Sequence, residues 1–309
     1  MIKAQKLTKK FDKHTALSEL SCTIPDSCVY GLVGSNGAGK STFLRLLSGI
    51  YRPDGGSVTV DDREVYGNND VLSSMVFVPD ELYFLPGATI DRMAELYLNT
   101  RGSINKERLA ELASLLSLDT KAPIAQFSKG MKRQAATILA LACEPKILLF
   151  DETFDGLDPV MRSVIKRVIV DDMLERQATV IITSHSLREL EDTCDQLALL
   201  HKGGLVLESD VANLKTSLFK AQIALPNDFT REDIAAACDC DILNFSKKGS
   251  VANIILRGKR DETEQKLHSL NPLILDILPL SLEEVFVYEM EALGYEFNDL
   301  IGGDSSNEA

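Results

Sequence analysis

Short continuous apolar runs recur along the first two thirds of the chain, and each run ends in small or polar residues. Three of them are "CVYGLVG" (28–34), "ILLFD" (147–151) and "TVIIT" (179–183). Runs of this length without alternation are typical of strands that are buried on both faces, as in the sheet of an α/β fold. Because ligands bind outside the carboxyl ends of such strands, we expect chemistry in the residues that follow each run.

The first run leads into a glycine-rich bend and then into a helical pattern. "KSTFLRLLSG" (40–49) has apolar residues at helical spacing and ends on a glycine, which is a common helix stop. Between strand and helix the residues follow the pattern G-x-x-x-x-G-K-S, from Gly34 to Ser41. Such glycines let backbone N–H groups turn inward, and the helix N-terminus adds partial positive charge. An ordinary glycine turn is the alternative, and the strand–helix context favours a cradle for a nucleotide triphosphate.

Acids follow the second run and a histidine follows the third. Asp151 ends its strand and is placed to hold Mg²⁺, while Glu152 can act as general base toward an attacking water. His185 stands at the end of the third run, where we expect a contact with the γ-phosphate. The alternatives are strand-end acids that face solvent and an ordinary surface or core histidine.

A fourth stretch, "IAQFSKGMKRQAATILALAC" (124–143), opens a long apolar helix. Ser128 is its expected N-cap, and Gly130 loosens the first turn. A helix N-terminus built from small residues can bind an anion, although this stretch by itself favours an ordinary capped helix.

Together and in this order, the four stretches resemble the nucleotide-binding subunit of an ATP-binding cassette (ABC) transporter. Residues 34–42 match the Walker A motif, "ILLFDE" matches Walker B with its catalytic glutamate, and "FDGLDP" looks like the D-loop. "FSKGM" resembles the ABC signature, usually written LSGGQ, and His185 is similar to the switch histidine. Phe11 stands where the family has the aromatic residue that stacks on adenine. The resemblance covers residues 1 to about 210.

The resemblance implies an ATPase with ATP and Mg²⁺ as cofactors. It implies catalytic roles for Lys40, Glu152 and His185. Mg²⁺ is expected at Ser41, Asp80 and Asp151. The residues expected to contact the nucleotide are Phe11, Gly34, Asn36, Gly37, Ala38, Gly39, Lys40, Ser41, Thr42, Asp80, Ser128 and Gly130.

The resemblance also implies partners. Two cassettes pair head to tail around two ATP molecules, so that Ser128 and Gly130 contact a phosphate held by the other chain. The second cassette is either this chain or a paralogue. Integral membrane permease subunits are the other expected partners, and they change conformation when hydrolysis opens the dimer. The apolar stretch from Tyr83 to Pro86 is expected either to dock on these subunits or to belong to the subdomain core.

Two departures from the family pattern change the picture. The third and fifth signature positions hold Lys129 and Met131, and Lys129 either adds charge near the trans phosphate or faces solvent. Where the family usually has a glutamine after a strand, "SMVFVP" is followed by Asp80. We expect Asp80 to take the place of that glutamine at Mg²⁺, because an aspartate is a charged oxygen ligand.

Beyond about residue 210 the pattern alternates between strand and helix. The order is roughly βαββαβ, which is ferredoxin-like, with an extra helix. "PLSLEEVFVYEME" resembles the end of the accessory domain of exporter-type cassettes, which is the basis for expecting export. The expected fold is a P-loop ABC ATPase of α/β class plus a small α+β domain. The expected parts are 1–212 (ATPase, with a helical subdomain at about 80–142), 213–290 (accessory domain) and 291–309 (acidic, disordered tail).

Composition narrows the class of partner and the compartment. The chain has 309 residues and a formal net charge of -13, which argues against nucleic acid as the main partner. No apolar stretch is long enough to span a membrane, and the N-terminus lacks a signal-peptide core. We therefore expect a cytoplasmic protein, peripheral on the inner face of the cytoplasmic membrane. A soluble ABC ATPase that remodels or signals to a cytosolic complex is the alternative, and the cargo stays open.

Overall fold

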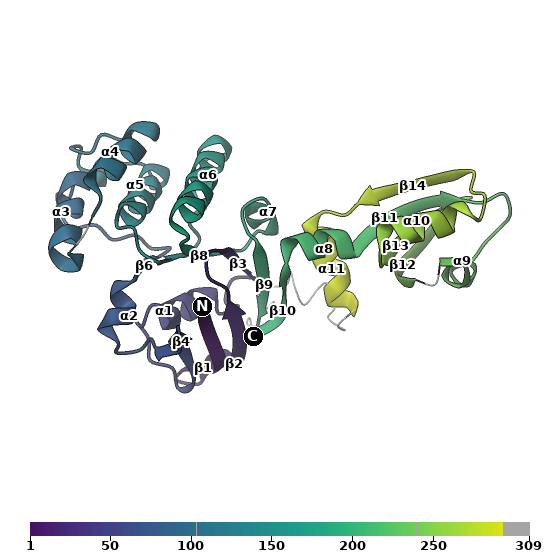
Figure 1. Ribbon diagram of the computed structural model, residues 1–309, viewed down its shortest axis with the longest axis horizontal. Coiled ribbons are helices and arrows are strands. Elements are labelled where there is room, and N and C mark those ends of the chain that lie inside the picture. Colours follow the sequence, from purple (N-terminus) through teal and green to yellow (C-terminus); the bar gives the residue numbers. More distant parts are fainter. Residues whose placement is uncertain (103, 239, 293–309) are drawn as a thin grey trace, which may run out of the picture. The chain divides into compact units, whose positions relative to one another are not determined.

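A computed structural model describes residues 1–102, 104–238 and 240–292 (Figure 1). The chain divides into two compact units, with the change at Glu208 and Ser209. The first unit has two sheets and the second unit has one, and each unit has a core of its own. No helix within the described ranges is both long and apolar enough to cross a bilayer.

The first unit is organised around a six-stranded sheet in the order β10-β9-β3-β8-β7-β6. β3 lies between β8 and β9 and is parallel to both, and β7 is parallel to β8 and β6. The carboxyl ends of these parallel strands therefore meet at one edge of the sheet. The strands are β3 (Val29–Val33), β6 (Met75–Val78), β7 (Ile147–Phe150), β8 (Thr179–Ser184), β9 (Gln196–His201) and β10 (Gly204–Asp210).

The apolar runs of the sequence are the central strands of this sheet. Every residue of β3, β7 and β8 is buried, which accounts for the absence of an alternating pattern. The α/β expectation for this part of the chain is confirmed.

A second sheet in the same unit has the order β2-β1-β4-β5. Its apolar side chains share one core with α1 (Lys40–Leu47) and with the six-stranded sheet, through Leu7, Phe43 and Leu149 among others. This core fixes the phosphate-loop helix between two sheets. The strands are β1 (Ile2–Phe11), β2 (His14–Ile24), β4 (Gly55–Val60) and β5 (Arg63–Glu64).

Helices α3, α4 and α5 form a group of their own in the first unit (Figure 1). Ser128 caps α5, since its hydroxyl oxygen accepts a hydrogen bond from the Met131 N–H at 3.2 Å. The helices of this unit are α2 (Asn69–Ser73), α3 (Ile90–Arg101), α4 (Lys106–Leu115), α5 (Lys129–Ala142), α6 (Pro159–Arg176) and α7 (Leu187–Leu190), with a 3₁₀ turn at Ile124–Gln126.

The second unit has a four-stranded antiparallel sheet in the order β12-β13-β11-β14. Its core, which includes Phe219, Ile254 and Leu267, draws on α9, α10 and one face of the sheet. The observed order after α8 is βαββαβ and then a helix, so the α+β expectation is confirmed. The elements are α8 (Val211–Ser217), β11 (Leu218–Ala224), α9 (Arg231–Cys238), β12 (Asp241–Lys248), β13 (Val251–Arg257), α10 (Arg260–His268), β14 (Ile274–Pro279) and α11 (Leu282–Ala292).

The expected tail begins inside a helix. Glu291 and Ala292 belong to α11, because the apolar spacing of "LEEVFVYEMEA" continues to that point. The rest of the expected tail, 293–309, lies outside the described residues.

Candidate functional site

The bend between β3 and α1 has the backbone that its glycines predict. Gly37 and Gly39 have φ values of 81° and 105°, in the region that only glycine enters without strain. A Cβ at Gly39 would also lie 2.7 Å from the carbonyl oxygen of Ala16. At Gly39 the loop packs so tightly onto β2 that no residue with a side chain fits. The positive φ values shape the bend that leads into α1.

Lys40 is the first residue of α1, and its side chain turns back toward the loop. Its Nζ donates to the carbonyl oxygen of Gly34 at 2.6 Å and lies 3.3 Å from Oε1 of Glu152. The residue is only 6% exposed. A buried ammonium at the mouth of the bend supplies the positive charge that phosphates require.

The bend opens into a pocket of about 300 Å³. Nine of the twelve residues expected to contact the nucleotide line it, together with Glu152. The lining residues are Phe11, His14, Ala16, Ser35, Asn36, Gly37, Ala38, Gly39, Lys40, Ser41, Thr42, Asp80 and Glu152. Gly34 does not line the pocket and packs against the backbone at Leu200 instead, where a Cβ would lie 2.5 Å from the carbonyl oxygen.

Asp151 lies directly after β7 with no exposed surface. Its Oδ1 accepts hydrogen bonds from the hydroxyls of Ser41 at 3.0 Å and Thr183 at 2.8 Å. Its Oδ2 has no hydrogen-bond partner in the described part of the chain. A buried carboxylate oxygen without a partner, next to a serine hydroxyl, is the donor set that Mg²⁺ prefers. The residues present therefore fit this ion.

Glu152 lies between two nitrogen-bearing side chains. Nδ1 of His185 is 3.0 Å from its Oε2, and Lys40 Nζ is close to its Oε1. Because a carboxylate only accepts, Nδ1 is the protonated nitrogen in this contact. The structure thus brings together three residues that come from α1 and from the ends of β7 and β8.

The signature residues lie elsewhere in the same chain. Neither Ser128 nor Gly130 is among the residues that line the pocket, and Ser128 caps its own helix as the sequence alone favours. The start of α5 instead approaches the D-loop. A Cβ at Gly130 would lie 3.1 Å from the carbonyl oxygen of Gly156, and Lys129 Nζ lies 2.6 Å from Asp155 Oδ2.

Asp80 has a partner that the sequence did not indicate. Its Oδ1 accepts from Nη2 of Arg133 at 2.6 Å, while Nη1 of the same guanidinium donates to the carbonyl oxygens of Asp80 and Pro79. Arg133 is 1% exposed on α5, and Asp80 also lines the nucleotide pocket. Asp80 therefore faces two ways, toward the pocket and toward α5.

Phe11 stands at the rim of the pocket, 40% exposed. Its ring meets the ring of Tyr51 edge to face, with centroids 5.3 Å apart. A partly exposed ring held by a second aromatic residue is suited to stacking on a planar base.

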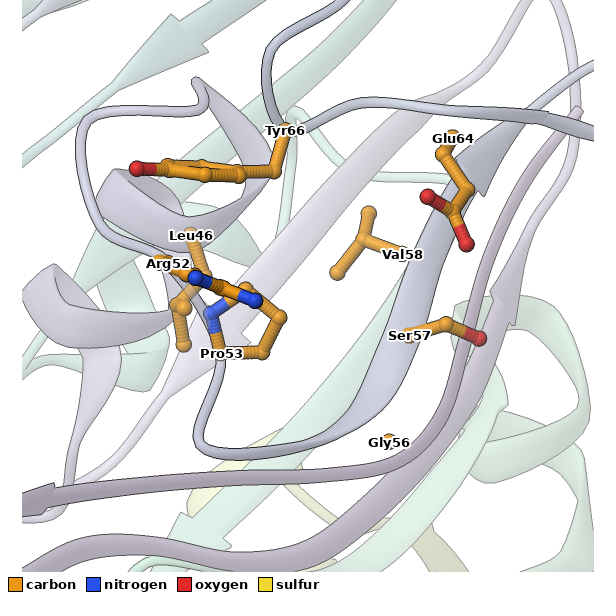
Figure 2. Close-up of a pocket in the computed structure, with 8 residues that line it drawn as sticks. All are labelled: Leu46, Arg52, Pro53, Gly56, Ser57, Val58, Glu64 and Tyr66. Carbon is orange, nitrogen blue, oxygen red and sulfur yellow. The ribbon is translucent and has the colours of Figure 1, made fainter.

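A second hollow lies on the β4–β5 side of the unit and shares no lining residue with the nucleotide pocket. Figure 2 shows the ring of Tyr66 above the guanidinium of Arg52, with Val58 on the facing strand. Its walls are apolar side chains and exposed polar ones, without a buried titratable group.

Two residues with clear contacts to the site were missed in the sequence. The hydroxyl of Thr183 donates to Asp151, and the guanidinium of Arg133 donates to Asp80. A signal existed for Thr183, since it is a polar residue at the end of an apolar run. Arg133 follows a helical pattern like any surface cation, so only the fold shows that it is buried.

Comparisons with known proteins point to one family. A family model described as "ABC transporter" matches residues 17–155. The chain is 30% identical over 212 residues to the lantibiotic transport ATP-binding protein SrtF of Streptococcus pyogenes, covering 68% of this chain and 91% of that protein. It is 28% identical over 287 residues to the ABC transporter ATP-binding protein YtrB of Bacillus subtilis (strain 168), covering 93% of this chain and 97% of that one.

Solved structures share the fold. A dimeric bacterial ABC transporter cassette has a TM-score of 0.63 and 22% identity, covering 68% of this chain and 99% of its own. The ATP-binding subunit of another ABC transporter has a TM-score of 0.65 and covers 70% of this chain. The shared fold thus covers about 70% of this chain.

Proposed function

This chain belongs to the ATP-binding subunits of ABC transporters, and we propose that it acts as one of two paired cassettes that drive a separately encoded membrane permease. Its activity is ATP hydrolysis. The observation that carries the proposal is the contact network of Lys40, Ser41, Asp151, Glu152 and His185 around one pocket.

Each side chain has a distinct part in the proposed hydrolysis. The loop N–H groups and the ammonium of Lys40 bind the β- and γ-phosphates, and Phe11 stacks on adenine. Glu152 takes a proton from the attacking water, and His185 orients that carboxylate through its Nδ1–H. Ser41 and Asp151 hold Mg²⁺, which when bound offsets the charge of the phosphates.

The second half of each site is proposed to come from a second cassette. The support is that Ser128 and Gly130 lie outside the pocket of their own chain, although both are signature residues. The helix N-terminus that they form is suited to a phosphate held by a partner. A second copy of this chain is the partner we propose.

Mixing two inactive variants tests this arrangement. Lys40→Ala removes the phosphate contact of one chain, and Ser128→Arg blocks the signature of the other. A head-to-tail dimer of the two variants contains one intact site, so the mixture should hydrolyse ATP well above either variant alone. Glu152→Gln should give an ATP-dependent dimer in gel filtration. A mixture that stays inactive while forming that dimer would count against sites shared between chains.

The membrane partner is proposed to dock on the loop after Asp80. Tyr83 is 80% exposed and Leu85 is 49% exposed, in a segment without helix or strand. Such side chains offer an apolar contact to a membrane subunit. The relatives named for lantibiotic and bacitracin transport support a transport role. The resemblance of "PLSLEEVFVYEME" to the end of an exporter-type accessory domain supports export.

A pull-down of this chain from its native membranes in mild detergent tests the transporter role. A polytopic membrane protein recovered in stoichiometric amount is the expected result. Recovery of the chain only with soluble proteins would favour an ATPase that acts on a cytosolic complex. Peripheral attachment to the inner face of the cytoplasmic membrane is part of the same proposal. The same pull-down tests it, because the experiment starts from native membranes.

A further inference from the structure

One buried hydroxyl touches both acidic residues of the hydrolytic site. Thr183, in β8, has no exposed surface. Its Oγ1 donates to Oδ1 of Asp151 at 2.8 Å and accepts from the backbone N–H of Glu152 at 3.0 Å. The pairing of β7 with β8 sets Phe150 opposite Ile182, which brings the next residue of each strand together.

We propose that Thr183 is a positioning residue that sets the carboxylate of Asp151 and the backbone of Glu152 for hydrolysis. The inference rests on the proposed hydrolytic site and adds a residue to it. His185 is on the same chain segment, two positions further. The hydroxyl of Thr183 therefore ties both acids to the strand that carries the histidine.

The orientation of Asp151 depends on this contact. Its Oδ1 accepts from two hydroxyls, those of Ser41 and Thr183, while its Oδ2 has no partner among the described residues. Two hydrogen bonds to one oxygen fix the rotation of the carboxylate. They leave the other oxygen available for the cation that accompanies the nucleotide.

The backbone of Glu152 depends on the same hydroxyl. Its φ is 46°, in the left-handed region that residues with a side chain rarely enter. A backbone in this region persists only when its surroundings hold it, and such residues cluster at active sites. The hydrogen bond from Glu152 N to Thr183 Oγ1 is one such restraint.

Threonine suits this task for chemical reasons. A hydroxyl donates once and accepts as well, so one atom can serve a carboxylate and an N–H group. Its β-branch limits rotation about χ1 and keeps that atom in place. Valine has nearly the same shape but can neither donate nor accept a hydrogen bond, whereas serine can do both.

The test compares Thr183→Val with Thr183→Ser. Steady-state hydrolysis should show kcat of the valine variant lowered about 10- to 100-fold, with KM for ATP changed less than about 3-fold, because the loop that binds phosphate is untouched. The serine variant should keep most of the turnover. ATP-dependent thermal stabilisation, titrated with Mg²⁺, should require more Mg²⁺ in the valine variant, which is a readout independent of turnover.

Thr193→Val is the matched control. Thr193 is also buried, and its Oγ1 has no hydrogen-bond partner within the described ranges, so this change should leave hydrolysis as in the wild type. Thr183→Ala serves as a second variant without the hydroxyl should the valine variant not fold, and it should show the same loss.

Two outcomes would overturn the inference. One is a folded Thr183→Val or Thr183→Ala variant with wild-type kcat and Mg²⁺ dependence, and the other is a serine variant as slow as these. Wild-type hydrolysis that is abolished by Lys40→Ala, measured alongside, shows that the proposed site itself holds. If that loss were absent, the proposed function would fail rather than the role of Thr183.

Discussion

Nη2 of Arg133 donates to Oδ1 of Asp80 at 2.6 Å and so joins the segment after β6 to the interior of α5. Arg133 is 1% exposed, and its charge has this carboxylate as an ion-pair partner. Removing one partner leaves a buried charge without compensation. The pair therefore connects the edge of the nucleotide pocket with the helix that begins at the signature.

Replacing Asp80 should reveal a structural role. Asp80→Ala is expected to lower the free energy of unfolding by about 1.5–3 kcal/mol, since it removes a hydrogen bond to a charged group. Asp80→Asn keeps an oxygen acceptor and should cost less. Thermal unfolding of the first unit measures both, with Glu81→Ala, an exposed neighbour, as the control. An unfolding midpoint unchanged in Asp80→Ala would contradict this role.

The same asparagine variant tests the expected Mg²⁺ role. If Asp80 also contributes an oxygen to Mg²⁺, Asp80→Asn should raise the Mg²⁺ concentration needed for half-maximal hydrolysis. Mg²⁺ dependence and turnover equal to the wild type would leave Asp80 with its structural contact alone.

The ion pair of Lys129 with Asp155 should contribute little and depend on salt. The two side chains are 67% and 43% exposed, so we expect a coupling of about 0.2–1 kcal/mol. A double-mutant cycle of Lys129→Met and Asp155→Asn at low and high salt measures it. Lys132→Met, on the same helix, is the control. A coupling independent of salt would contradict a pair held by charge.

This coupling also has a predicted pH dependence. The hydrogen bond from Lys129 lowers the pKa of Asp155 below its ordinary value of 3.8. The folded state thus favours the charged form, so the stabilisation is fully present above pH 3.8 and is lost as pH falls through the lowered pKa. Lys129→Met should let the pKa of Asp155 rise toward 3.8, which a pH titration of this carboxyl measures.

The exposed loop after Asp80 should matter for the membrane partner and not for hydrolysis. Tyr83→Asp places a charge on a side chain that is 80% exposed, so folding and basal ATP hydrolysis should be unchanged. Recovery of the permease in the detergent pull-down should fall sharply. Tyr66→Asp changes an exposed tyrosine at the other hollow and should have no effect. Equal recovery with both variants would rule out this docking loop.

The cysteines should be slow to react while the chain is folded. Five of the six are buried, and Cys240 is partly exposed. Burial raises the pKa of Cys22 and of Cys28 to about 12, so almost no thiolate forms at pH 8. Ellman's reagent at pH 8 should therefore label one thiol quickly, and all six after unfolding. Cys240→Ser should remove the fast phase, and several fast thiols in that variant would contradict the burial.

Local features were determined by the sequence. The phosphate loop was predictable because positive φ values at Gly37 and Gly39 are a property of the residues themselves. The central strands were predictable because burial on both faces removes polar residues from the run. The order of elements from β11 to α11 followed from the same periodicities, while α8 was missed and α11 extends past the expected domain end at residue 290.

Contacts between distant segments were decided by the tertiary structure. Asp80 and Arg133 are separated by 53 positions, Asp151 and Thr183 by 32, and they meet through the packing of α5 and the order of the strands. No local pattern marks which cation is buried or which carboxylate a strand-end hydroxyl will contact. The residue types proposed to perform hydrolysis are thus evident in the sequence, while their hydrogen-bond partners depend on strand register and helix packing, which are set by the whole core.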